Sequence, residues 1–456
     1  MEERKNVYKL PAGDTTLLWY SRAVIEMKRR ATTNPTSWNY QAAMHGFRAN
    51  LPLWQGAGPF PGQAEQNQFW NQCQHQTWFF LPWHRMYLAF FEEIVRQTVV
   101  DLGGPQNWAL PFWDYSDSTN PNARTIPPAF RTPANQTNGL WMPGRNNTVR
   151  ERDVSLRSLN TQPYTGNGRT SPLGFGGPQT TFSHFGNTNG AVENSPHNAV
   201  HGSIGGAMGN PLTAALDPIF WLHHANIDRL WQVWLNRGNR VNPTQSAWLD
   251  FRFNLHDKDG NRVQMRCSEV RDTRQVLSGY NYEGVPLGGP VLESLAISDF
   301  SMPLEVIAAT NQTVTLGSQT TMVPLTLQSP LRKKSDLETV LESVNVPQST
   351  ILHFENITGK GVPPIQDIYL NVPEDDGDKQ SYYAGSLNLF GVEESSTPDL
   401  HHSGSGQHYA LDISELMIKL RSLPTWKEQE LDISIEPAWG MENASVTIGR
   451  ISLYSE

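Results

Sequence analysis

Histidine is the residue type with the clearest chemical potential in this chain, because eight of its 13 histidines lie in the first half. The stretch CQHQTWFFLPWHR, residues 73–85, places two of them beside a cysteine in a strongly aromatic segment. His197 and His201 are four residues apart, so on a helix both imidazoles project from one face and could share a metal ion. A single histidine on an apolar face is more often a hydrogen-bonded core residue, but six in such segments are harder to explain that way.

The number of histidines indicates how many metal ions they could hold. Imidazole-only sites favour copper, zinc, iron or nickel. A lone zinc needs about four ligands, so six histidines indicate two metal ions with three imidazoles each. The two trios that we expect are His45, His75 and His84, and His197, His201 and His224.

A proline decides how the first trio can form. His75 and His84 are nine residues apart, which would put them on opposite faces of one continuous helix. Pro82 is instead expected to mark a helix start near Trp83, with His84 in the first turn. His75 then lies on the preceding segment and is free to fold back towards His45, which ends its own helical segment.

The second trio depends on the helix predicted for DPIFWLHHANIDRLW, residues 217–231. On that helix His223 points about 100° away from His224 and is not expected to serve the same site. Asp228 follows His224 by four residues and shares its face. That spacing suits a carboxylate that orients a metal-bound imidazole, or a polar pair near the helix end.

The pattern of the chain changes from helical to extended. The first ~115 residues and the stretch around 217–238 have helical apolar spacing, and residues 116–195 between them are rich in Asn, Thr, Pro and Gly. Alternation around an Asp-Gly turn predicts a hairpin over residues 252–267, and strand patterns dominate from about 300. We expect a mainly α core with long loops followed by an all-β, sandwich-like domain. The expected division is residues 1–285, with a hairpin extension over about 245–285, a linker over 286–300 and a β-rich domain over 301–456.

Composition narrows the class of partner. The 456 residues carry a net charge of −9, and no block of Lys and Arg stands out, which argues against nucleic acid or an anionic membrane as a partner. No apolar run approaches the ~20 residues that cross a bilayer. Two cysteines suit a reducing compartment, and the N-terminus lacks the apolar stretch of a secretion signal, so we expect a cytoplasmic protein.

Four motifs carry a family resemblance: CQH…FFLPWHR, LPFWDYS, PHNAVHG and DPIFWLHHANIDRLW. They resemble those of the type 3 copper proteins, which include tyrosinases, catechol oxidases and mollusc-type haemocyanin units. The match covers about residues 40–240. The segment 247–283, with its Tyr280-x-Tyr282 pair, looks like the one that follows the copper domain in plant polyphenol oxidases, and the last ~110 residues resemble their C-terminal domain more faintly.

The resemblance implies a ligand set and a crosslink. His45, His75 and His84 would bind one copper ion, and His197, His201 and His224 the other. The Cys-x-His spacing at Cys73 is similar to that of members in which the cysteine is joined to the histidine as a thioether, here His75. The alternative is that Cys73 is a small buried hydrophobic residue.

The resemblance also implies a reaction. A helical dicopper core would use O2 to hydroxylate small monophenols and to oxidise o-diphenols to o-quinones. In tyrosinase-like members, an Asn after the first ligand of the second copper and a nearby Glu hold a water that takes the phenol proton. Asn198 and Glu193 match that pattern, although the pair Glu193-Asn194 could equally cap a helix. Phe220 is our candidate for stacking on a substrate ring.

Several alternatives stay open at this point. A catechol or o-aminophenol oxidase would lack the monophenol step, and an oxygen carrier would bind O2 reversibly. The C-terminal domain could cap the copper site and keep the enzyme latent. In DLHHSGSGQH, a secondary copper contact at His401, His402 or His408 competes with a merely solvated loop. The sequence does not determine the oligomeric state.

Overall fold

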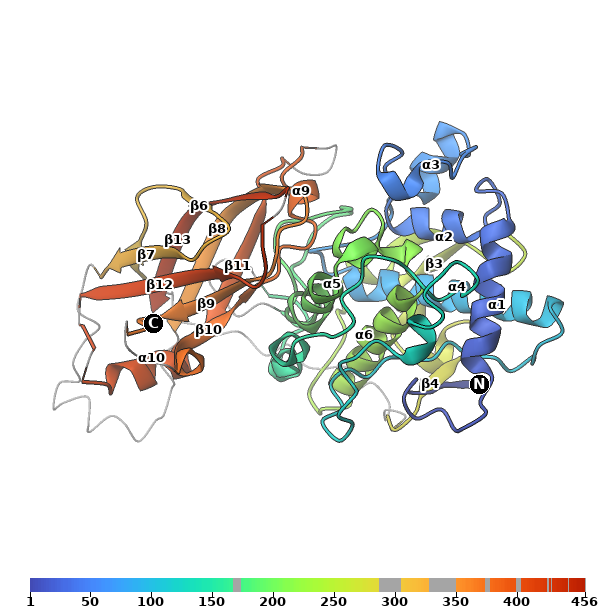
Figure 1. Cartoon of the computed structure of the whole chain (residues 1–456), viewed down its shortest axis with the longest axis horizontal. Helices are drawn as coiled ribbons and strands as arrows, with labels where there is room; N and C mark the ends of the chain where they lie inside the picture. Colours follow the sequence, from blue (N-terminus) through green and yellow to red (C-terminus); the bar gives the residue numbers. More distant parts are fainter. Residues whose placement is uncertain are drawn as a thin grey trace. The chain divides into compact units, whose positions relative to one another are not determined.

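The computed structural model of the chain describes residues 1–166, 174–286, 305–327, 350–373, 378–398, 403–424, 426–427, 429–441 and 443–455. They form two compact units, coloured along the chain in Figure 1. The first unit holds residues 1–166, 174–185 and 190–286, and the second holds residues 186–189 together with the described residues from 305 onwards. His401, His402 and the predicted linker, apart from Pro286, lie outside the described residues.

The first unit is mainly helical, as its apolar spacing predicts. Its helices are α1 (Thr16–Arg29), α2 (Trp38–His45), α3 (Gln63–Phe69), α4 (Phe80–Asp101), α5 (Ala199–Ile204), α6 (Ile219–Leu235) and α7 (Ser246–Leu249). Helix α4 begins at Phe80 rather than near Trp83, because Pro82 fits within the first turn, where an N–H has no partner in the helix. No helix in the described part of the chain combines the length and the hydropathy needed to cross a membrane.

Aromatic residues build the core of this unit. Helices α4 and α6 pack against each other, and almost every residue of the first four turns of α4 is buried. The tryptophans that rank among the largest fully buried side chains are Trp38, Trp54, Trp70, Trp78, Trp83, Trp113, Trp221, Trp231, Trp234 and Trp248. Such large rings exclude water around the two helices that carry His84 and His224.

Two small sheets complete the first unit. Strands β2 (Arg252–His256) and β3 (Arg262–Arg266) form the antiparallel hairpin that the Asp-Gly turn predicts. Strand β1 (Glu2–Arg4) pairs in parallel with β4 (Tyr280–Tyr282), so the N-terminus is fixed beside a segment almost 280 residues later.

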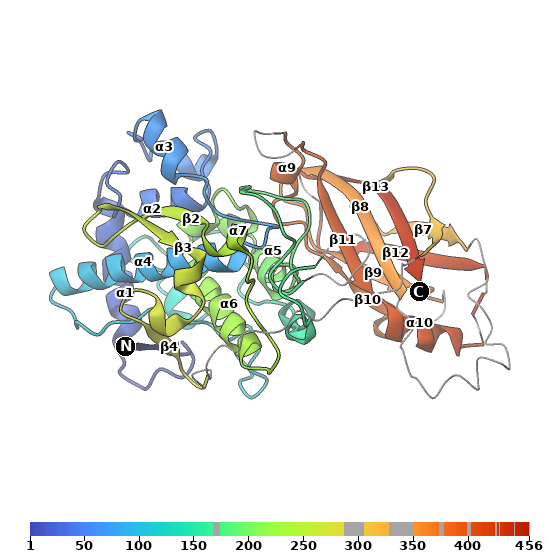
Figure 2. The same cartoon turned by 180° about the vertical axis from the view of Figure 1, so that it is seen from behind.

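The second unit is a β-sandwich. One sheet has the order β10 (Tyr383–Leu387), β9 (Gln366–Leu370), β12 (Glu430–Pro437) and β7 (Thr321–Thr326). The other has β11 (Gln407–Asp412), β8 (Thr350–Lys360), β13 (Ser445–Ser455) and β5 (Glu305–Ala309), with β6 (Val314–Leu316) also on β13. Figure 2 shows β11, β8 and β13 side by side. One cluster of buried side chains draws on strands of both sheets, with helices α9 (Val392–Ser395) and α10 (Ser414–Arg421) at its edge, which confirms the predicted fold class.

Candidate metal centre

The first predicted trio comes together in the helical unit. His45 is the last residue of α2, His84 lies in α4, and His75 lies on the segment before α4. Their ligand atoms and the sulfur of Cys73 lie within 4.8 Å of one another, and all four residues are buried. Nε2 of His45 and Nε2 of His75 are 3.4 Å apart.

Backbone carbonyls orient two of these imidazoles. Nδ1 of His45 lies 2.9 Å from the carbonyl oxygen of Pro211, and Nδ1 of His84 lies 2.8 Å from that of Phe80. A carbonyl oxygen can only accept, so each Nδ1 carries the proton and each Nε2 presents its lone pair to the cluster. This is the tautomer that binds a metal through Nε2.

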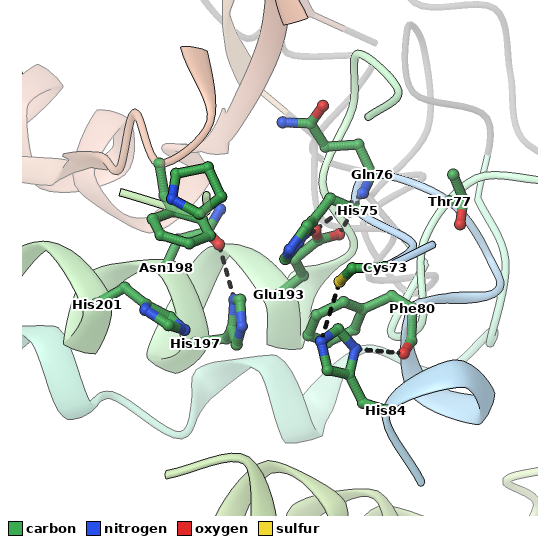
Figure 3. A network of polar contacts seen from close by, with 12 residues as sticks. Cys73, His75, Gln76, Thr77, Phe80, His84, Glu193, His197, Asn198 and His201 are labelled. Carbon is green, nitrogen blue, oxygen red and sulfur yellow. Dashed lines mark hydrogen bonds and ion pairs between the residues drawn. The ribbon is translucent and has the colours of Figure 1, made fainter. Parts of the chain in front are cut away.

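A buried carboxylate holds the third imidazole. Oε1 of Glu193 lies 3.1 Å from Nδ1 of His75 and accepts the backbone N–H of Gln76 at 2.8 Å (Figure 3). Burial raises the pKa of Glu193 to about 8, while its backbone hydrogen bonds act in the opposite direction. The ring of Phe185 stacks on His75 with centroids 5.1 Å apart and an interplanar angle of 13°. Sequence reasoning missed Phe185, since it lies 110 positions from His75 in a loop without periodicity.

The second predicted trio also converges. His197 and His201 lie in the consecutive segments η5 (Glu193–Asn198) and α5, and His224 lies in α6. Nε2 of His224 is 3.3 Å from Nε2 of His197 and 3.3 Å from Nε2 of His201. With metal–nitrogen bonds of about 2.0 Å at near-tetrahedral angles, two ligand nitrogens lie about 3.3 Å apart. The spacing therefore fits three imidazoles that share one ion.

Neighbouring oxygens orient two imidazoles of this trio. Nδ1 of His197 lies 2.8 Å from the amide oxygen of Asn198, and Nδ1 of His201 lies 2.8 Å from the carbonyl oxygen of Met208. Nδ1 of His224 has no hydrogen-bond partner among the described residues. Met208 and Pro211 both belong to the stretch 205–216, so one loop orients an imidazole in each trio.

Burial keeps these imidazoles neutral. It lowers the pKa of His84 and of His201 to about 3. Burial, reinforced by neighbouring histidines, also holds the pKa values of the other four well below the usual value. Metal binding needs deprotonated imidazoles, so no proton has to be removed at neutral pH.

The two trios face each other. The rings of His84 and His224 stack with centroids 4.3 Å apart and an interplanar angle of 14°. Phe220 is fully buried and packs against His45 at 4.8 Å and His224 at 4.1 Å between centroids. It therefore packs against one imidazole of each trio, and its stacking on a substrate stays a prediction.

Two expectations differ from the structure. His223 was not expected at the site, yet one of its ring nitrogens belongs to the same group as His197, His201 and His224. Its ring lies 5.3 Å from that of His197 and 4.8 Å from that of His201, because all four rings crowd into one small buried space. Neither of its nitrogens has a hydrogen-bond partner among the described residues.

Asp228 does not orient His224. Its carboxylate accepts Nε of Arg85 at 2.5 Å and the hydroxyls of Tyr280 and Tyr282 at 2.6 Å each, and it lies 3.5 Å from Arg4. Although burial acts in the opposite direction, the two guanidinium groups hold its pKa below the usual value. Two fully buried arginines need a counter-charge more than a neutral imidazole needs an acceptor. Asp228 thereby joins α6 to α4 one residue from His84.

Cys73 is buried and forms no disulfide. Its sulfur lies 3.3 Å from Nε2 of His84. Figure 3 shows the thiol between His75 and His84. The thioether to His75 stays a prediction.

The donor set fits two copper ions. Each trio offers neutral imidazole nitrogens, which suit copper. Imidazoles pressed this closely, with their lone pairs facing one another, repel in the absence of a shared cation. The residues therefore satisfy the number, chemistry and spacing that a two-ion site requires.

Comparison with known proteins identifies the family. Residues 35–237 match the common central domain of tyrosinase. A tyrosinase named HcTyr1 from Hahella sp. (strain CCB-MM4) is 40% identical over the full length of both chains. The chain belongs to the tyrosinase family. It is therefore a copper-dependent oxidoreductase with a two-copper site and O2 as co-substrate, and the recognition from its histidine motifs is confirmed.

More distant relatives agree with this assignment. The latent form of a chloroplastic polyphenol oxidase from Prunus armeniaca is 28% identical over 82% of this tyrosinase-family chain and 64% of its own length. The structure of latent apple tyrosinase has a TM-score of 0.61 at 22% identity and covers 100% of this chain and 97% of its own, which shows the shared fold. Residues 303–456 match a domain family of unknown function.

Proposed function

We propose that this tyrosinase-family protein hydroxylates small monophenols and oxidises o-diphenols to o-quinones, with one copper ion on each histidine trio. The arrangement of Glu193 and Asn198 beside two of the proposed ligands supports the monophenol step. Glu193 contacts His75 in the first trio, and Asn198 contacts His197 in the second. A possible proton acceptor thus contacts one trio, and a side-chain amide that can donate contacts the other.

The two reactions differ in stoichiometry. A monophenol and one O2 give one o-quinone and one water, whereas two o-diphenols and one O2 give two o-quinones and two waters. The copper pair, when bound, supplies the activation of O2. The protein must in addition remove the phenol proton, because a phenol is a poor ligand and nucleophile until it is ionised.

Glu193 and Asn198 would divide that task. The amide nitrogen of Asn198 can donate to a water oxygen while its amide oxygen stays on His197. The same water can donate to Glu193 in its carboxylate form, which the positive charge of bound copper would favour although burial alone raises its pKa to about 8. It would take the phenol proton and pass one of its own to Glu193, so the base acts without contacting the substrate. Burial keeps this relay away from bulk water.

Oxygen uptake tests the proposed function. Copper-loaded protein is given tyramine in one cell and dopamine in the other, and O2 consumed is measured against quinone formed. We expect one O2 per quinone from tyramine and half as much from dopamine. Uptake with dopamine alone would indicate a catechol or o-aminophenol oxidase. Reversible O2 binding without quinone from either would indicate an oxygen carrier.

Two isosteric variants test the proton relay. Asn198→Asp keeps the oxygen that His197 needs and removes the donor to water, and Glu193→Gln keeps the acceptor for His75 and removes the base. We expect each to lower tyramine oxidation by about 10²–10⁴, with a much smaller effect on dopamine oxidation and with two copper ions retained. An equal loss with both substrates would contradict the relay.

A further inference from the structure

Four residues from the middle of the catalytic sequence belong structurally to the β-sandwich. The segment 186–189 clusters with the second unit, although the residues on both sides of it belong to the first. Thr188 forms a parallel bridge with His408 of β11, and the backbone N–H of His408 donates to the carbonyl oxygen of Asn187 at 2.6 Å. Thr188 and Asn189 are buried. The segment is therefore paired with β11 through one isolated bridge and one backbone hydrogen bond.

The pairing of β11 with β8 passes over His408, so the backbone of His408 can contact the segment 186–189. Strand β11 stands at the end of its sheet, and its pairing with β8 skips from Gln407 to Tyr409. A bulged residue has an N–H that takes no part in the ladder. In His408 this N–H is used by Asn187, while the imidazole accepts the backbone N–H of Asn356 through Nδ1.

The segment 186–189 connects two contacts with one ligand. On its N-terminal side, the ring of Phe185 stacks on that of His75, and the backbone carbonyl oxygen of His184 accepts the backbone N–H of His75 at 3.1 Å. On its C-terminal side, Glu193 contacts Nδ1 of His75 and the backbone of Gln76. The chain thus leaves His75 at residue 185 and returns to it eight positions later, and the four residues fixed to β11 lie in between.

We propose that β11 anchors the segment 186–189 and thereby positions His75 and Glu193, which gives the C-terminal domain a direct role in forming the first copper site. Anchoring the middle of a short loop restricts both of its ends, so less conformational entropy is lost when the metal binds. Positional tolerance at such sites is small, since a shift of about 1 Å can lower a rate about a hundredfold. The proposal rests on the proposed ligand role of His75 and is independent of the phenol that is oxidised.

A pair of variants at one position separates the backbone from the side chain. His408→Pro removes the N–H that Asn187 accepts, and an edge strand with an outward N–H is where proline is tolerated. His408→Ala also loses the imidazole but keeps that N–H, so it is the matched control. Amide hydrogen exchange is followed by mass spectrometry in the metal-free full-length chain, and copper per chain is measured after reconstitution.

We expect His408→Pro to speed exchange at residues 183–194 and 74–79 at least tenfold, and His408→Ala to match the unaltered chain there. The affinity of the first copper site should fall about 10–100-fold in the proline variant, as when an orienting partner is lost, while the second copper stays. Faster exchange confined to β11 and β8, with two copper ions bound normally, would overturn the proposal. Because exchange is measured without metal or phenol, failure of the oxidase assay leaves this result interpretable.

A second variant covers the case in which His408→Pro does not fold. Two glycines inserted between Asn189 and Gly190 keep the bridge between Thr188 and His408 but lengthen the backbone that connects this bridge to Glu193. We expect residues 190–194 and 74–79 to exchange faster while residues 186–189 stay protected. Unchanged exchange at 74–79 would show that His75 is positioned without the anchor.

Discussion

The two histidine trios differ in how the chain assembles them. His45, His75 and His84 come from three separate segments, and each has an acceptor on Nδ1 supplied from elsewhere in the fold or from the preceding helical turn. In the second trio, His197 and His201 are one helical turn apart, and His224 has no acceptor on Nδ1 among the described residues. All three imidazoles of the first site are therefore brought together by tertiary contacts, whereas in the second site two come from neighbouring helical turns and only His224 comes from another helix, together with an additional imidazole, His223.

Loss of one proposed ligand from either trio is the largest expected effect. His84→Ala and His201→Ala should each reduce bound copper from two ions to one per chain, because we propose that three imidazoles hold each ion. Oxidase activity should fall at least about a thousandfold in both variants, since groups that act as a unit lose nearly everything together. Copper is measured by plasma mass spectrometry. Two ions retained in either variant would contradict the assignment of that residue.

Asp228 tests the connection between the two trios. Asp228→Asn removes the carboxylate that pairs with the buried Arg85 and lies near the buried Arg4, and breaking such a pair destabilises a protein by about 3–5 kcal/mol. Urea unfolding of the metal-free chain measures the change. The control is Asp259→Asn, which removes an exposed ion pair with Lys258 and should leave the urea unfolding midpoint almost unchanged. Equal stability of the two variants would show that the ion pairs of Asp228 do not stabilise the fold.

A variant of Glu193 tests whether the first trio can be weakened without affecting the second. Glu193→Leu removes the acceptor for Nδ1 of His75 and for the backbone of Gln76, so copper affinity should fall about 10–100-fold at the first site alone. Competitive titration with a chelator resolves the two sites. Glu193→Gln keeps the acceptor and should bind copper normally. If both sites weaken together in Glu193→Leu, the trios are not held independently.

The same contrast explains what the sequence can predict. Side-chain identity and spacing predict the six histidines, the i,i+4 pair, the hairpin and the β-sandwich, since these depend on local periodicity. The sequence gives no signal for the roles of the Pro211 and Met208 carbonyls, because every residue has the same backbone carbonyl group. Phe185 meets His75 only through the path of a long loop.

Errors about α6 have a similar cause. Helical geometry alone places Asp228 beside His224, but the buried arginines that attract its carboxylate come from β1 and α4. The angular separation of His223 from His224 is correct for a helix, yet two rings on neighbouring positions can still lie in one cavity when other elements close around them. Local geometry predicts which side chains share a face, and the tertiary fold decides what that face meets.

The smallest effect is expected at His223. Both of its nitrogens are buried without a hydrogen-bond partner among the described residues, and replacing such a group with an apolar one of similar size is nearly neutral. His223→Leu should keep two copper ions and change the free energy of unfolding by about 1 kcal/mol or less. His224→Leu, one position later, should lose the second ion. If His223→Leu also loses it, the second site has four imidazole ligands, and the asymmetry between the trios lies in ligand number rather than in orientation.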